Sequence, residues 1–218
     1  MLIFKSKKQA GLTLIEMMIA MVLGLFVTAV IITVFSTNVR SSTENIKMIR
    51  LNQELRGVMT MMVDELKRAG YSNVPTVTAF MDELNFTTTC ARYSYDEDNS
   101  ATAGDTAPGT DERFGFRLNS NTIEWARNAT GTGCTGGDWT EITDPDLASI
   151  TTLDFDITGS VNTLGTTGSD TFSTTSGVSV YEVTITLTGT TDLPHSSDAN
   201  DPRRTMTETV RIRNEAPK

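Results

Sequence analysis

An uninterrupted apolar stretch dominates the start of the chain. Residues 17–39 contain no charged side chain. Because an α-helix rises about 1.5 Å per residue, this stretch would reach about 35 Å, which is enough to cross the hydrocarbon core of a bilayer. An apolar run of this length predicts a membrane-spanning helix rather than a helix in a protein core.

The helical pattern continues beyond the apolar stretch. Residues 36–70 contain no proline, and their apolar positions recur at steps of three and four, as on one face of an α-helix. These positions are Leu51, Leu55, Val58, Met62, Leu66 and Ala69. Gly70 is placed to end the helix, and Pro75 follows it. We expect the apolar face to pack against a sheet.

Alternating apolar and polar positions predict β-strands in the remainder of the chain. Residues 114–118 and 122–127 form an expected hairpin around a polar turn at 119–121. Three further segments alternate in the same way, at 153–157, 181–187 and 206–212. The expected fold class is α+β, with a long N-terminal helix packed on an antiparallel sheet of about four to six strands.

The carboxylate of Glu16 lies at the start of the apolar stretch and requires an explanation. An acid within the bilayer costs about 2.5–3.5 kcal/mol on insertion scales, so it should have a partner. Residues 1–11 carry three lysines and no acid, but the apolar stretch is too long for an ordinary secretory signal. If cleavage fell after Gly11, the new amine of Leu12 would lie about one helical turn from Glu16. In a stack of such chains, that amine could neutralise the Glu16 of a neighbour.

The segment from Gly11 to Glu16 reads GLTLIE and closely resembles the type IV prepilin cleavage and methylation motif. In that family a dedicated peptidase cuts after the glycine and methylates the new amine. The resemblance implies that Gly11 and Leu12 form the cleavage and methylation site and that Glu16 belongs to an assembly charge pair. Leu12 departs from the family pattern, in which phenylalanine is usual. The alternative is an uncleaved membrane anchor.

Two later segments are similar to a subgroup of this family. Residues 64–71, which end on Ala-Gly-Tyr, resemble the helix end of the PilW group of minor pilins. Residues 208–214 are similar to the closing strand of that group and of the type II secretion pseudopilin J. The resemblance implies a minor pilin that acts in the initiation and assembly of type IV pili, in a tip complex. A type II secretion pseudopilin J and a tip adhesin are the alternatives.

The resemblance also implies a domain organisation. We expect a leader over residues 1–11, a transmembrane and filament-core helix over 12–39, an amphipathic helix half over 40–71 and a β-rich domain over 72–218. The leader lysines place the N-terminus in the cytoplasm by the positive-inside rule, and the domain in the periplasm of a Gram-negative cell. The expected partners are the prepilin peptidase, other minor and major pilins and the inner membrane, with the pilus surface as the final location.

The net charge and the cysteine content bear on the ligands that the chain can bind and on its covalent structure. The formal net charge of −9 argues against binding to nucleic acid, because such proteins neutralise phosphates with basic side chains. Cys90 and Cys134 are the only two cysteines. An even count in an oxidising compartment favours a disulfide between them, and two buried free thiols are the alternative.

No sequence motif supports catalysis. The chain has no Gly-x-Ser-x-Gly elbow, phosphate-cradling loop or His-Glu-x-x-His pattern, and its one histidine, His195, lies in a polar segment. Acids gather in residues 96–112, namely Asp96, Glu97, Asp98, Asp105, Asp111 and Glu112. Their spacing does not match an EF-hand loop, so we expect a solvated acidic loop, with calcium binding as the alternative. We expect no enzyme, no cofactor and no metal site.

Overall fold

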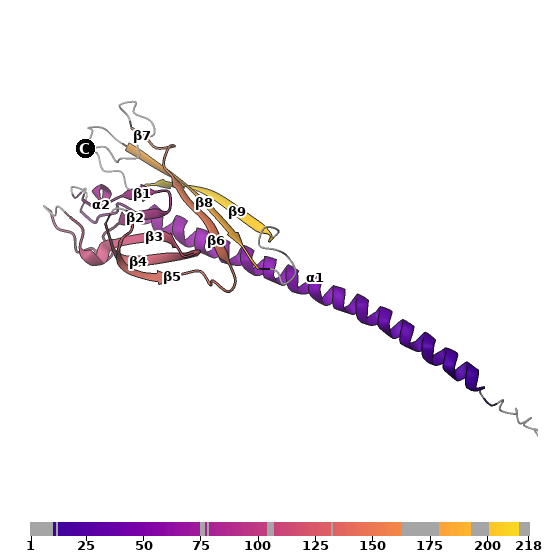
Figure 1. Cartoon of the computed structure of the whole chain (residues 1–218). Coiled ribbons are helices and arrows are strands. Elements are labelled where there is room, and N and C mark those ends of the chain that lie inside the picture. Colours follow the sequence, from indigo (N-terminus) through magenta and orange to yellow (C-terminus); the bar gives the residue numbers. More distant parts are fainter. Residues whose placement is uncertain are drawn as a thin grey trace, which may run out of the picture. The chain divides into compact units, whose positions relative to one another are not determined.

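The structure is a computed structural model that describes residues 11, 13–74, 77, 79–103, 107–131, 133–162, 179–192 and 201–213. The chain divides into two compact units, Met1–Ile46 and Lys47–Lys218 (Figure 1). The boundary between the units falls within a helix.

One unbroken helix, α1, covers Leu14–Arg68 and contains 55 residues. It passes through Gly24 without interruption. Gly70 follows the helix with a φ of 77°, a left-handed conformation that glycine adopts without a steric penalty. Its amide donates to the carbonyl oxygen of Ser94 at 2.7 Å. The predicted helix and its glycine stop are therefore confirmed.

The first sheet has five antiparallel strands in the order β1-β2-β3-β4-β5. They are β1 Asn85–Thr87, β2 Cys90–Ser94, β3 Arg113–Asn119, β4 Thr122–Thr130 and β5 Gly136–Glu141. The predicted hairpin is β3 and β4, and its turn residues Ser120 and Asn121 have φ of 48° and 68°. Two positive φ values match the twist of the flanking strands. Two short helices, α2 Ala79–Asp82 and η1 Thr110–Glu112, lie in the segments around these strands.

The second sheet is built around a long central strand. It contains β6 Ser149–Asp156, β7 Val161–Asn162, β8 Ser179–Thr190 and β9 Arg203–Ile212. Both β6 and β7 pair with β8, and β9 pairs with the other edge of β8 along ten residue pairs. The α+β class is confirmed, but the expectation of one sheet with about four to six strands is wrong. The described residues form two sheets. The sequence analysis did not predict β2 and β5, because buried and exposed positions do not alternate in these strands.

The core of the second unit lies between the later part of α1 and both sheets (Figure 1). The six helix residues predicted to form the apolar face are all buried. They share one cluster with Phe114 and Phe116 of β3 and with Ile185 and Leu187 of β8. Close packing requires Gly189 in β8, because a Cβ there would lie 2.9 Å from Cδ2 of Leu55.

Candidate processing and assembly site

Gly11 is exposed and lies three residues before Leu14, the first residue of α1. A Cβ added at Gly11 would meet nothing within 4 Å, and its φ lies outside the left-handed region. The fold therefore does not require glycine at this position. Residues 1–10 and Leu12 lie outside the described residues, so the structure does not place the expected leader or the expected new N-terminus.

Thr13 caps the first turn of α1. Its hydroxyl oxygen accepts a hydrogen bond from the amide of Glu16 at 3.4 Å, and its carbonyl oxygen accepts one from the amide of Met17 at 3.2 Å. A threonine followed by glutamate three residues later is the capping-box pattern. The sequence analysis missed this role of Thr13, although the pattern Thr-x-x-Glu was visible there.

Glu16 is exposed in the first turn of the helix. The positive end of the helix dipole stabilises a carboxylate at this position. The helix dipole therefore stabilises Glu16 within its own helix, in addition to the intermolecular partner that the sequence predicts.

The first part of α1 exposes apolar side chains all round. Leu14, Met21, Phe26 and Phe35 are 80%, 71%, 70% and 68% exposed. Among the described residues, α1 alone is long and apolar enough to span a membrane, and its most apolar stretch is not buried in the fold. A helix that is apolar on every side needs lipid or other helices around it.

The threonines within this apolar segment satisfy their own hydroxyl groups. Thr28 donates to the carbonyl oxygen of Gly24 at 2.7 Å, and Thr33 donates to that of Ala29 at 2.9 Å. Thr37 donates to the carbonyl oxygen of Thr33 at 3.0 Å. Because a hydroxyl bonded within the helix needs no water, these threonines fit a hydrocarbon environment.

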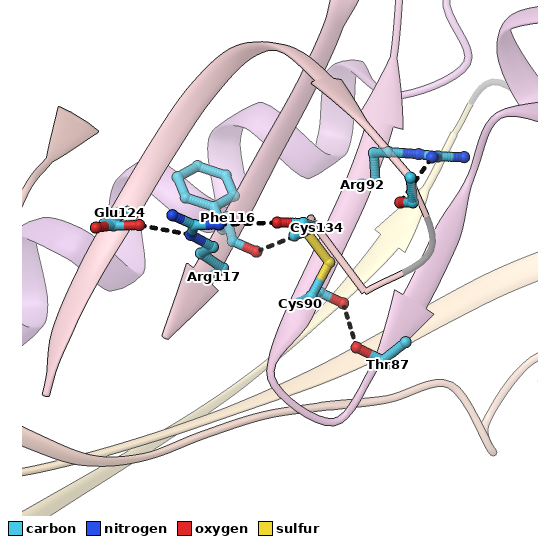
Figure 2. Close-up of a disulfide and its surroundings, with 8 residues drawn as sticks. Thr87, Cys90, Arg92, Phe116, Arg117, Glu124 and Cys134 are labelled. Atoms are coloured by element: carbon cyan, nitrogen blue, oxygen red, sulfur yellow. Dashed lines mark hydrogen bonds and ion pairs between the residues drawn. A yellow bond between two sulfur atoms is a disulfide. The ribbon is translucent and has the colours of Figure 1, made fainter. Parts of the chain in front are cut away.

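A disulfide joins Cys90 at the start of β2 to Cys134 in the loop between β4 and β5 (Figure 2). Both cysteines are buried. The side chain of Arg117 on β3 lies beside the bond; its guanidinium contacts Glu124 at 2.5 Å and donates to the carbonyl oxygen of Cys134 at 2.9 Å. Arg92 of β2 donates to the carbonyl oxygen of Gly131 at 2.9 Å in the same loop. The loop is thus attached to the sheet by one covalent bond and two arginines.

A polar cluster inside the core links α1 to the first sheet. Glu65 accepts hydrogen bonds from the hydroxyls of Tyr93 and Tyr95, both at 3.2 Å, and pairs with Arg68 at 3.1 Å. Trp125 donates to the hydroxyl of Tyr93 at 3.3 Å. The sequence analysis did not identify these residues as a cluster. The two tyrosines are two positions apart, and this spacing would have indicated that they lie on the same face of a strand.

The acidic residues of the β2–β3 connection separate into two groups. Glu97 pairs with Arg127 at 2.6 Å, and Asp111 is exposed. Asp96, Asp98 and Glu112 come together, with one carboxylate oxygen of each within 4.8 Å of the others. Asp105 and His195 lie outside the described residues.

Two known families match the chain. The prokaryotic N-terminal methylation motif matches residues 6–32. The family of prepilin peptidase-dependent protein B matches residues 44–212. Among solved structures, the chain is similar to a type IV-like pilin from Thermus thermophilus, with a TM-score of 0.45 and 13% sequence identity over 76% of this chain and 98% of that chain. No curated protein matches the chain at a significant level.

A methylation motif, an exposed apolar N-terminal helix and an antiparallel β domain together define a type IV pilin-like protein. This class consists of structural, non-enzymatic proteins. The chain belongs to the prepilin peptidase-dependent protein B family, whose match covers both sheets and the buried part of α1. Processing by a prepilin peptidase follows from this membership, and the apolar helix indicates a membrane-anchored precursor.

Proposed function

We propose that the chain is a minor pilin that helps initiate and assemble a type IV pilus, with its domain near the tip. The observation that carries this proposal is the first part of α1, which is apolar and exposed on every side and begins with one acid, Glu16. Such a helix can exchange lipid for the helices of neighbouring subunits without burying new polar groups.

Maturation at the start of this helix is the first step of the proposal. The prepilin peptidase removes residues 1–11 and methylates the amine of Leu12. Gly11 has no role in the fold that another residue could not fill, since open space surrounds the position of its missing Cβ. Recognition by the peptidase therefore explains the glycine better than folding does.

Charge matching is the second step. The amine of Leu12 in one subunit neutralises Glu16 of its neighbour, and the pair sets the register of the two helices. Each charge alone is costly in lipid, whereas the pair is tolerated. Residues 12–39 would then form the filament core, residues 40–71 the amphipathic helix half, and residues 72–218 the β-rich domain.

The proposed locations follow from these steps. The precursor spans the inner membrane once, with its domain in the periplasm, and the assembled protein lies in the pilus at the cell surface. Its partners are the prepilin peptidase and the other minor and major pilins. We assign no catalytic step to the chain.

The mass of the exported protein tests the maturation step. We expect the mature chain to begin at Leu12 with a methylated amine, and Gly11→Val to leave the full-length precursor. Gly24→Val is the matched control, because an added Cβ at either glycine meets nothing within 4 Å. It should be processed normally. A mature protein that still begins at Met1 would refute the proposal.

A deletion strain tests the assignment to a pilus. Loss of surface pili and of twitching supports a minor pilin, whereas secreted enzymes retained in the periplasm would indicate a type II secretion pseudopilin J. Normal pili together with loss of attachment to a surface would instead indicate a tip adhesin.

A further inference from the structure

Three carboxylates that are far apart in the sequence meet where β2 ends and β3 begins. The last residue pair of these strands is Ser94 and Arg113. The amide of Tyr95 continues the pairing by donating to the carbonyl oxygen of Glu112 at 3.3 Å. This pairing brings Glu112, at the end of η1, beside Asp96 and Asp98.

Two of these three carboxylates are buried. Asp96 is 2% exposed and Glu112 is 8% exposed, while Asp98 lies at the surface. Backbone amides orient them: Ser100 donates to Oδ1 of Asp96 at 2.9 Å and to Oδ1 of Asp98 at 3.0 Å, and Asn73 donates to Oδ2 of Asp96 at 3.2 Å. The acids are therefore held in place by the main chain.

Glu112 has one oxygen whose binding capacity is unused. Its Oε2 accepts a hydrogen bond from the amide of Gly109 at 2.7 Å. Its Oε1 is buried, and no hydrogen-bond donor among the described residues reaches it. A buried carboxylate oxygen without a donor is costly, so it marks a place where a bound cation or a proton is required.

Among the described residues, none of the three carboxylates has an ion-pair partner. Two nearby arginines contact other acids: Arg127 pairs with Glu97 at 2.6 Å, and Arg113 pairs with Glu83 at 3.7 Å.

We propose that Asp96, Asp98 and Glu112 bind a calcium ion. All three ligands are carboxylates, which a hard cation prefers, and there is no nitrogen or sulfur ligand among them that would favour zinc. Calcium binds oxygen at about 2.3–2.6 Å, so two oxygens on opposite sides of the ion lie about 5 Å apart. The three oxygens lie within 4.8 Å of one another, which is compatible with such a sphere. Magnesium binds oxygen at about 2.0–2.1 Å, demands nearly ideal octahedral geometry and keeps several waters, so it is rarely held by a set of three protein carboxylates.

This site departs from the sequence expectation of a solvated acidic loop without metal. The ion would connect the segment after β2 to the segment before β3, so it would hold together both ends of the long β2–β3 connection. Waters and main-chain carbonyl oxygens would complete the six to eight ligands that calcium takes.

Calorimetry on the full-length protein in detergent tests the site. The protein is first treated with EDTA and then titrated with calcium chloride. We expect one calcium ion to bind per chain and to raise the melting temperature of the protein. Glu112→Gln should weaken calcium binding by about tenfold or more, because it removes a charged ligand. Asp111→Asn is the matched control: it makes the same charge change one residue away and should bind as the wild type does. Absence of calcium-dependent heat in the wild type, or equal weakening in both variants, would overturn the proposal.

A second variant shows whether weaker calcium binding in Glu112→Gln comes from loss of a ligand or from misfolding. Asp98 is exposed, so Asp98→Asn should leave the domain folded and should still weaken calcium binding by about tenfold. Terbium luminescence, excited through tyrosine and displaced by calcium, reports the same site independently. Unchanged calcium affinity in Asp98→Asn would overturn the assignment.

Discussion

Glu65 on α1 accepts a hydrogen bond from Tyr93 on β2, with 3.2 Å between the carboxylate and hydroxyl oxygens. Tyr93 is fully buried, so the pair lies inside the core. Apolar packing alone allows a helix to rotate about its axis and to slide along it. A hydrogen bond at one position fixes both the rotation and the axial position. The contact therefore fixes how the buried part of α1 meets the first sheet.

Removing the charge of Glu65 should destabilise the domain. Glu65→Gln keeps the size of the side chain, but its amide is a weaker acceptor for two tyrosine hydroxyls. We expect the free energy of unfolding to fall by about 1–3 kcal/mol, measured by urea denaturation in detergent. Asp64→Asn is the control, because Asp64 forms only an exposed pair with Lys67 at 3.1 Å. It should cost less than about 1 kcal/mol. Equal losses in the two variants would contradict a special role for Glu65.

The same cluster predicts a loss of stability in alkaline solution. Burial raises the pKa of the Tyr93 hydroxyl well above 10.0, and the charge of Glu65 raises it further; the same two causes raise the pKa of Tyr95. The unfolded chain releases these protons near pH 10, while the folded chain retains them. The free energy of unfolding should therefore fall as the pH rises above about 10.

Glu65→Gln should make this alkaline loss shallower, because it removes the second cause of the raised pKa values. Ultraviolet absorbance of tyrosinate, together with denaturation at several pH values, measures both quantities. If the pKa values of Tyr93 and Tyr95 were no lower in Glu65→Gln than in the wild type, the assigned contact would be wrong.

The disulfide should stabilise the domain considerably. Cys90 and Cys134 are 44 residues apart, and closing a loop of this length restricts the unfolded chain by about 4 kcal/mol on the chain-entropy account. Replacing both cysteines with serine should therefore lower the free energy of unfolding by about 2–4 kcal/mol. A reductant should produce a similar loss in the wild type and none in the double variant. Two alkylatable thiols in the exported protein would show that the bond does not form in the cell.

Thr13 and Glu16 should have separable effects. Thr13→Ala removes the helix cap, at a cost of about 1 kcal/mol, and should increase hydrogen exchange at the Glu16 amide. Glu16→Ala leaves the cap hydroxyl in place but removes the charge. We expect both variants to be cleaved, and only Glu16→Ala to reduce incorporation into pili strongly. Equal incorporation of the two variants would mean that Glu16 acts only on its own helix.

Two glycines should respond in opposite directions to a larger side chain. Gly189→Val places atoms against Leu55 and Ile150 and should destabilise the domain by about 1–3 kcal/mol through overpacking. Gly57 is exposed on α1, where an added Cβ meets nothing within 4 Å. Gly57→Ala should stabilise the helix by about 0.5–1 kcal/mol. Urea denaturation compares the two, and destabilisation by Gly57→Ala would indicate a contact on that face.

Local patterns were sufficient to predict the helix and the hairpin. The absence of charge over residues 17–39, the three- and four-residue steps from Leu51 to Ala69, and Gly70 together define α1. Ser120 and Asn121 are polar residues that tolerate positive φ, so the turn between β3 and β4 could also be located.

The division into two sheets could not be predicted from such patterns. In β2 the buried positions do not alternate, since Ala91, Tyr93, Ser94 and Cys90 are all buried. Strand pairing is also a long-range property: β6 pairs with β8, although β7 and a long connection lie between them in the sequence. A local window contains no information about such a partner.

The candidate sites show the same difference. Gly11 and Glu16 could be identified because their motif is continuous in the sequence. The meeting of Asp96 with Glu112 depends on the pairing of β2 with β3, so it became visible only in the structure. The capping role of Thr13 was also predictable, because the pattern Thr-x-x-Glu is continuous in the sequence.

The position of the cap has a consequence for maturation. Thr13 follows the proposed scissile bond, so the hydroxyl that closes the first helical turn stays with the shortened chain. Cleavage of the leader would therefore create a new N-terminus without unfolding the first turn of α1. The mature subunit would then present an already helical N-terminus to a neighbouring subunit.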